Sequence, residues 1–123
     1  QLIEGKLTID RHFEQAVIIA DQRKFVSALI VPNFAALKEW AESQGITGLS
    51  NEEMCHDKRV IKFIGERIDT LQQDLAHYER IKRFTLLPQP FTMENGELTN
   101  TLKIKRRTVY ANHAAAIDAM YAE

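Results

Sequence analysis

The sequence predicts an α/β (α+β) fold, a small sandwich in which helices flank a short mixed sheet that contains a β-hairpin. Two runs rich in Val, Ile and Phe, at residues 13–20 and 24–32, are separated by a short polar segment. A long amphipathic stripe follows, and one more strand-like run precedes a closing helical pattern. Two strands, helices and a third strand in this order predict one layer of sheet covered by helices.

The composition bounds the class of protein. A chain of 123 residues fits a single domain, 1–123. With 16 Lys and Arg against 17 Asp and Glu, the chain is nearly neutral, which excludes an overall positive field that would attract polyanions. The single Cys55 cannot form an internal disulfide, and no apolar run approaches the ~20 residues of a membrane span. We expect a soluble, cytoplasmic protein. Because the chain starts at Gln1 inside a helical pattern, we also expect a fragment of something longer.

The first half of the chain predicts a helix, a hairpin and a second helix. Leu2, Ile3, Leu7 and Ile9 have near-helical spacing, and "DQR" at 21–23 is the expected hairpin turn. The nearly continuous apolar stretches 17–20 and 28–31 predict strands that are covered on both faces.

The next helix has a cap at each end. Asn33 is its expected cap and Gly45 its expected end, with Phe34, Leu37 and Trp40 on one face. Ser50 and Glu53 have the spacing of a capping box, which predicts a short helical turn after the loop.

The second half predicts a long helix, a strand, a loop and a closing helix. The stripe of the long helix predicts five or six turns packed on the sheet, with Gln72 among the residues that face water. Its members are Val60, Ile64, Ile68, Leu71, Leu75 and Tyr78. "RFTLLPQPF" predicts a strand ended by prolines, the loop after it turns at Gly96, and a single helix covers 109–121.

No complete catalytic constellation is found in the sequence. The four histidines, His12, His56, His77 and His113, have no i, i+4 spacing, so no metal site is expected. Cys55 is placed in a polar turn beside His56 and is not expected to be a catalytic thiol. Gly-rich phosphate loops and a "GxSxG" elbow are absent from the sequence.

The basic run from Lys103 to Arg107 holds four cations in five positions. In an extended "TLKIKR", the side chains of Leu102 and Ile104 would anchor the segment while Lys103 and Lys105 point the other way. A solvated basic turn that opens the last helix is the simplest interpretation of these residues. A nucleic-acid or phosphate-binding module is the alternative, although no aromatic residue interleaves with the cations to stack bases.

Three stretches together resemble a known family. "ALIVPNFAALKEWA", "YERIKRFTLLPQPFTMENGELTNTLKIKRR" and "AAAIDAMY" are similar to the C-terminal domain of long-chain fatty acid CoA ligases, within the AMP-forming adenylating superfamily. The most specific part is "ENGELTNTLKIKRR". Asn100 stands where that family usually has Pro, and Leu102 stands where the wider superfamily more often has Gly.

The resemblance implies a function for the whole enzyme. The lysine that serves adenylation matches Lys103, and other loop and basic positions of the motif match Gly96, Glu97, Thr99, Thr101, Lys105, Arg106 and Arg107. It implies an N-terminal partner domain, absent from this sequence, that binds ATP, Mg²⁺ and the fatty acid. It also implies CoA as a substrate, a second pose for thioester formation, no nucleic acid, and peripheral membrane association of the full enzyme. We expect the isolated domain to be inactive and to hold no cofactor alone.

Overall fold

The fold is given by a computed structural model that describes residues 2–20 and 23–122. The expected hairpin turn at Asp21 and Gln22 lies outside the described residues. The elements are α1 (Leu2–Ile9), β1 (Phe13–Ile19), β2 (Val26–Pro32), α2 (Phe34–Ser43), α3 (Asn51–His56), α4 (Lys58–Leu71), a 3₁₀ helix (His77–Glu79), β3 (Ile81–Leu86), α5 (Arg106–Asn112) and α6 (Ala114–Tyr121).

The sheet is mixed, as the sequence predicted. Its order is β1-β2-β3, with β1 antiparallel and β3 parallel to the central β2. An antiparallel neighbour needs only a hairpin connection, whereas a parallel neighbour needs a long crossover, and α2, α3 and α4 supply it. The strand order therefore follows from the order of elements along the chain.

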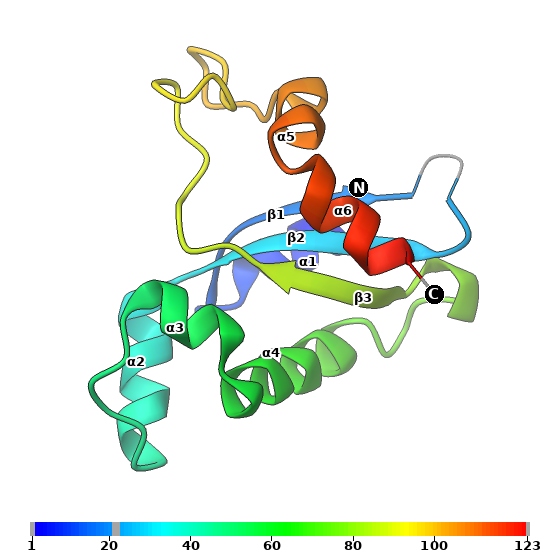
Figure 1. Cartoon of the computed structure of the whole chain (residues 1–123). Helices are drawn as coiled ribbons and strands as arrows, with labels where there is room; N and C mark the ends of the chain where they lie inside the picture. The colour runs from blue at the N-terminus through cyan, green and yellow to red at the C-terminus, as the bar shows by residue number, and fades with distance from the viewer. Residues whose placement is uncertain (1, 21–22, 123) are drawn as a thin grey trace.

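Helices cover both faces of the sheet (Figure 1). Ala28 and Ile30 of β2 point into a core formed with α1, α2, α3 and α4. Leu29 and Val31, which alternate with them, point into a second core formed with α5 and α6. All four side chains are at most 2% exposed, so the continuous apolar runs are explained by burial on two faces.

The predicted helix caps are present. Asn33 Oδ1 accepts the Ala36 N–H at 3.2 Å, and Gly45, at the end of this helical segment, has a φ of +77°. Ser50 Oγ accepts the Glu53 N–H at 3.1 Å, while Glu53 Oε1 accepts the Ser50 N–H at 2.8 Å. Both cap motifs identified in the sequence are therefore confirmed.

Two positions of the predicted long helix, one in its apolar stripe and one on its polar face, differ from the prediction. The helix ends at Leu71, and Tyr78 is 80% exposed beyond it. Gln72 is 3% exposed, because its side-chain amide pairs with the backbone of Ile81 as a neighbouring strand would. Gln72 Oε1 accepts the Ile81 N–H at 2.8 Å and Gln72 Nε2 donates to the Ile81 carbonyl at 3.2 Å. Gln72, at the end of α4, is thus a buried polar residue that links this helix to the outer edge of β3.

The two ends of the chain also depart from the predicted patterns. The closing helix is two helices, broken at His113, whose φ of −117° and ψ of 25° lie outside the helical range. In α1, Ile3 and Leu7 are buried, but Ile9 is 86% exposed because it lies at the helix end. Within the described residues, no helix has the length and apolar character needed to cross a membrane.

Replacing Gln72 with alanine tests its role as a strand partner. Gln72→Ala leaves the buried N–H and C=O of Ile81 unpaired, so the free energy of unfolding should fall by about 2 kcal/mol. Gln73→Ala, at the exposed neighbouring position, should change it by less than about 0.5 kcal/mol. Urea unfolding followed by circular dichroism measures both, and equal values for the two variants would contradict the assignment.

Candidate functional site

The basic run is carried by a small hairpin that stands clear of the sheet before α5 (Figure 1). Leu98 and Ile104 pair as an antiparallel bridge. The Lys105 N–H donates to the Glu97 carbonyl at 2.8 Å, and the Thr99 N–H donates to the Lys103 carbonyl at 2.7 Å. The backbone thus folds back on itself with residues 100–102 at its tip.

A turn and a bulge close the tip. The Leu102 N–H donates to the Thr99 carbonyl at 2.9 Å, and Leu102 has a φ of 63°. This is the arrangement of a three-residue hairpin loop, in which a turn is followed by one left-handed residue that is usually glycine. A leucine in this conformation costs roughly 1–2 kcal/mol. The backbone immediately before Lys103 is therefore strained.

The predicted anchoring of the basic run is half right. Ile104 is partly buried against the second core, as expected. Leu102 is 67% exposed and does not anchor the segment, because the left-handed residue turns the chain where an extended strand was expected. Lys103 is presented by a turn, not by an alternating strand.

Thr99 fixes the backbone around Lys103. Its hydroxyl oxygen accepts the Lys103 N–H at 3.0 Å and the Thr101 N–H at 3.3 Å, and it lies 3.0 Å from the Thr101 hydroxyl. Gly96 makes the preceding turn with a φ of 79°, as predicted. The Lys103 side chain itself is exposed, and its ammonium has no partner in the described part of the chain. The result is a free cation on a fixed backbone.

The four cations of the run are not equivalent. Arg106 Nη2 lies 2.8 Å from both carboxylate oxygens of Glu4, and this hydrogen bond raises the pKa of the guanidinium. Glu4 Oε2 also accepts the Ile18 N–H at 2.9 Å, at the free edge of β1. Arg106 was predicted as part of a supporting basic surface, but it ties α5 to α1 and β1. Lys103, Lys105 and Arg107 are exposed.

Glu97 is the buried member of the predicted set. It is 4% exposed, and its Oε2 accepts from Asn112 Nδ2 at 3.1 Å and lies 2.9 Å from His113 Nε2. Sequence analysis had assigned no role to Glu4, Asn112 or His113. The spacing of residues in the sequence does not indicate these partners. Glu4 and Arg106 are 102 positions apart in the chain, and Asn112 and His113 are 15 and 16 positions from Glu97.

A groove runs beside the hairpin between α1 and β1. It encloses about 350 Å³, and its lining includes Leu98, Leu102 and Ile104 on one side and Glu4 and Glu14 on the other. The Glu4 carboxylate is already paired with Arg106, and the lining adds the Glu14 carboxylate and, among the described residues, no cation, so the groove is unsuited to the triphosphate of a nucleotide. Lys103 itself does not line this groove.

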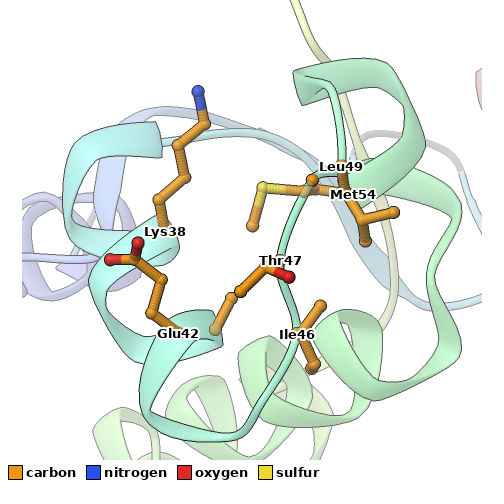
Figure 2. Close-up of a pocket in the computed structure, with 8 residues that line it drawn as sticks. Lys38, Glu42, Ile46, Thr47, Leu49 and Met54 are labelled. Carbon is orange, nitrogen blue, oxygen red and sulfur yellow. The ribbon is translucent and has the colours of Figure 1, made fainter.

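A second hollow lies between α2 and α3 (Figure 2). It encloses about 100 Å³, well below the size of usual small-molecule sites. Its labelled lining residues are Lys38, Glu42, Ile46, Thr47, Leu49 and Met54. In the described residues, no group of three or more His, Cys, Asp or Glu is placed to hold a metal ion.

Cys55 is buried in α3 instead of lying in a polar turn. It is 5% exposed, and burial, with a smaller contribution from the Glu52 charge, raises the pKa of its thiol to about 11. A thiol is a nucleophile only as thiolate, so Cys55 is a core residue.

Replacing Leu102 tests the strain at the hairpin tip. Leu102→Gly is expected to be more stable than Leu102→Ala by about 1 kcal/mol, because glycine adopts a positive φ without a Cβ penalty. At ordinary positions the order is reversed, since glycine loses more entropy on folding. Denaturant unfolding of the two variants gives the sign, and a more stable alanine variant would rule out the left-handed conformation.

Thiol reactivity tests the assignment of Cys55 to the core. At pH 8 a disulfide reagent such as Ellman's reagent should modify the native chain at least about 100-fold more slowly than the chain in guanidinium, because native Cys55 is buried and its thiolate is disfavoured. Absorbance of the released thiolate measures both rates. Equal rates would show that Cys55 is accessible and ionised in the fold.

Curated relatives match nearly the whole chain. Peroxisomal long chain acyl-CoA synthetase 7 of Arabidopsis thaliana is 39% identical over 98% of this chain. A long-chain-fatty-acid–CoA ligase of Mycobacterium tuberculosis is 32% identical over 98%, and human long-chain-fatty-acid–CoA ligase 1 is 38% identical over 79%. The chain spans 18%, 20% and 14% of the length of these relatives, respectively.

Solved structures share the fold. The adenylation domain of a carboxylate reductase from Mycobacterium chelonae matches with a TM-score of 0.77 at 22% identity. A didomain of carboxylic acid reductase from Segniliparus rugosus, in complex with AMP, matches with 0.75 at 23% identity. Each match covers 98% of this chain, and 17% and 15% of those chains.

A family model described as the AMP-binding enzyme C-terminal domain matches residues 1–123. The α/β fold, the mixed three-stranded sheet and the "ENGELTNTLKIKRR" hairpin agree with this match. The chain therefore belongs to the family of AMP-binding enzyme C-terminal domains and is homologous to long-chain acyl-CoA synthetases.

Proposed function

We propose that this chain is the C-terminal domain of a long-chain fatty acid CoA ligase and that Lys103 is its catalytic cation during formation of the acyl adenylate. The observation that carries the proposal is the exposed Lys103 ammonium, which has no partner among the described residues, on a hairpin whose backbone is fixed by hydrogen bonds. Identities of 32–39% to long-chain ligases over most of the chain support the substrate class.

The chemistry of adenylation explains the need for such a cation. When a fatty carboxylate attacks the α-phosphorus of ATP, two anions must approach each other and negative charge builds on the phosphoryl oxygens. An ammonium with three donors on a flexible stem can bridge carboxylate and phosphate oxygens. Because the backbone of the hairpin is fixed, only the four-carbon side chain of Lys103 must be ordered on binding, which reduces the conformational entropy that is lost.

The partners of the reaction are assigned outside this domain. The groove beside the hairpin is lined by the Glu14 carboxylate and by no cation of the described chain, which makes it unsuited to a triphosphate. We assign ATP, Mg²⁺ and the acyl pocket to an N-terminal adenylating domain of the same protein, which Lys103 enters. A rotation of the C-terminal domain would then withdraw Lys103 before CoA attacks the adenylate.

Separate half-reactions of the full-length enzyme test the role of Lys103. Lys103→Ala should lower the rate of adenylate formation, measured by pyrophosphate exchange, by about 10² to 10³, because one preorganised donor to the developing charge is lost. Thioester formation from supplied acyl adenylate and CoA should change by less than about threefold, since it occurs in the other pose.

Lys62→Ala is the matched control. Lys62 is an exposed cation on α4, on the opposite side of the sheet from the second core, and both half-reactions should stay at the wild-type rate. Equal loss of both half-reactions in Lys103→Ala would contradict the proposal. So would loss of adenylation in Lys62→Ala to the same extent, which would indicate a general charge effect.

A further inference from the structure

We infer that Glu97 is a positioning residue for Lys103: its buried carboxylate fixes the base of the hairpin to the α5–α6 junction and so sets where Lys103 points. The inference rests on the proposed function of Lys103. Its own observation is the contact of one carboxylate oxygen with Asn112 and His113, the last residue of α5 and the residue at the helix break.

Burial makes the contact of Glu97 specific. The side chain of Glu97 is 6% exposed, and a carboxylate removed from water is strongly unfavourable unless donors replace the lost hydration. Asn112 Nδ2 and His113 Nε2 are such donors at 3.1 and 2.9 Å. Both approach the same atom, Oε2, so the orientation of the carboxylate is defined from two directions.

A series of contacts links the α5–α6 junction to the sheet. The His113 ring meets the Phe91 ring edge-on, with centroids 6.0 Å apart. The Phe91 N–H donates to Gln15 Oε1 at 2.7 Å and its carbonyl accepts from Gln15 Nε2 at 3.0 Å, which attaches it to β1. Glu97 therefore joins the hairpin to β1 of the sheet through His113, Phe91 and Gln15.

The position of Glu97 in the hairpin makes it relevant to Lys103. The Glu97 carbonyl accepts the Lys105 N–H at 2.8 Å, so Glu97 and Lys105 form the base from which the tip projects. Lys103 lies two residues above this base. On the other side, Arg106 is held by Glu4. With the Glu97 carboxylate removed, the hairpin keeps the Arg106–Glu4 contact and the packing of Leu98 and Ile104 on the second core. It loses its side-chain link to the α5–α6 junction, so the direction in which its tip projects is less well defined.

The loss of such a contact should appear as a selective loss of rate. Reacting groups that are displaced by about 1 Å can lose about 100-fold in rate. We therefore expect Glu97→Ala in the full-length enzyme to lower kcat for adenylate formation by about 10- to 100-fold. The KM values for fatty acid and ATP should stay within about twofold, because Glu97 touches neither substrate.

The experiment uses five single variants, with Lys103→Ala and Glu97→Ala among them, and one double variant. Asn112→Ala removes one donor and leaves the carboxylate paired with His113, so it should show a smaller loss of the same kind. Glu97→Gln keeps an oxygen that accepts one hydrogen bond and should recover part of the rate. Glu94→Ala, at an exposed position of the same loop, is the matched control and should retain full activity.

The double variant separates positioning from an independent effect. Glu97→Ala combined with Lys103→Ala should be no slower in adenylation than Lys103→Ala alone, because Glu97 acts through Lys103. Multiplicative losses would overturn the inference, as would an equal fall in thioester formation from supplied acyl adenylate. If Glu97→Ala does not fold, as judged by its melting curve, an unchanged adenylation rate in Asn112→Ala overturns it.

Failure of the inference and failure of the proposed function give different results. If Lys103→Ala slows both half-reactions equally, the proposed function fails and the inference with it. If Lys103→Ala is selective for adenylation while Glu97→Ala is indistinguishable from Glu94→Ala, only the inference fails. The single variants at positions 97 and 103 are therefore measured side by side with the same two assays.

Discussion

The constraint on which the rest of the structure depends is the burial of β2 on both faces. Leu29 and Ile30 are fully buried and point to opposite faces, so two layers of helix are required. The chain forms the first layer with α1 to α4 and must then cross to the other face after β3. The segment that crosses contains the Lys103 hairpin, which explains why the hairpin projects beyond the sheet before α5 begins (Figure 1).

The hairpin combines a fixed base with a free tip. Glu97 and Arg106 stand on either side of it, and each is joined by hydrogen bonds to residues of other elements. Both contacts carry formal charge in partly buried surroundings, where a mismatched partner is penalised more than in water. Lys103 also carries a formal charge, but no such contact is found for it among residues 2–20 and 23–122. The position of the hairpin is therefore defined at its base, while the Lys103 side chain at its tip stays exposed.

Local rules predicted those parts of the fold that local interactions determine. The caps at Asn33 and Ser50 and the two-faced strand follow from neighbours within a few residues, and the structure has them. Gln72 was assigned to the solvent because its amide is polar, yet Ile81, nine positions away, uses it as a strand partner. Burial of a polar group depends on a distant partner, which periodicity in the sequence does not reveal.

In the site, too, some features follow from local patterns in the sequence and others do not. The motif singled out Lys103, and the alternation around it predicted that Ile104 is anchored, but it also predicted the same for Leu102. The prediction for Leu102 is wrong because this residue has a left-handed conformation. The turn that it forms breaks the strand alternation, in which every second side chain shares a face, on which the prediction was based. In the part of the chain that the structure describes, the exposed Leu102 belongs to neither core, so no core contact there offsets its backbone strain. A glycine would form the same bulge at lower cost, so the stability of this domain alone does not account for a leucine next to Lys103.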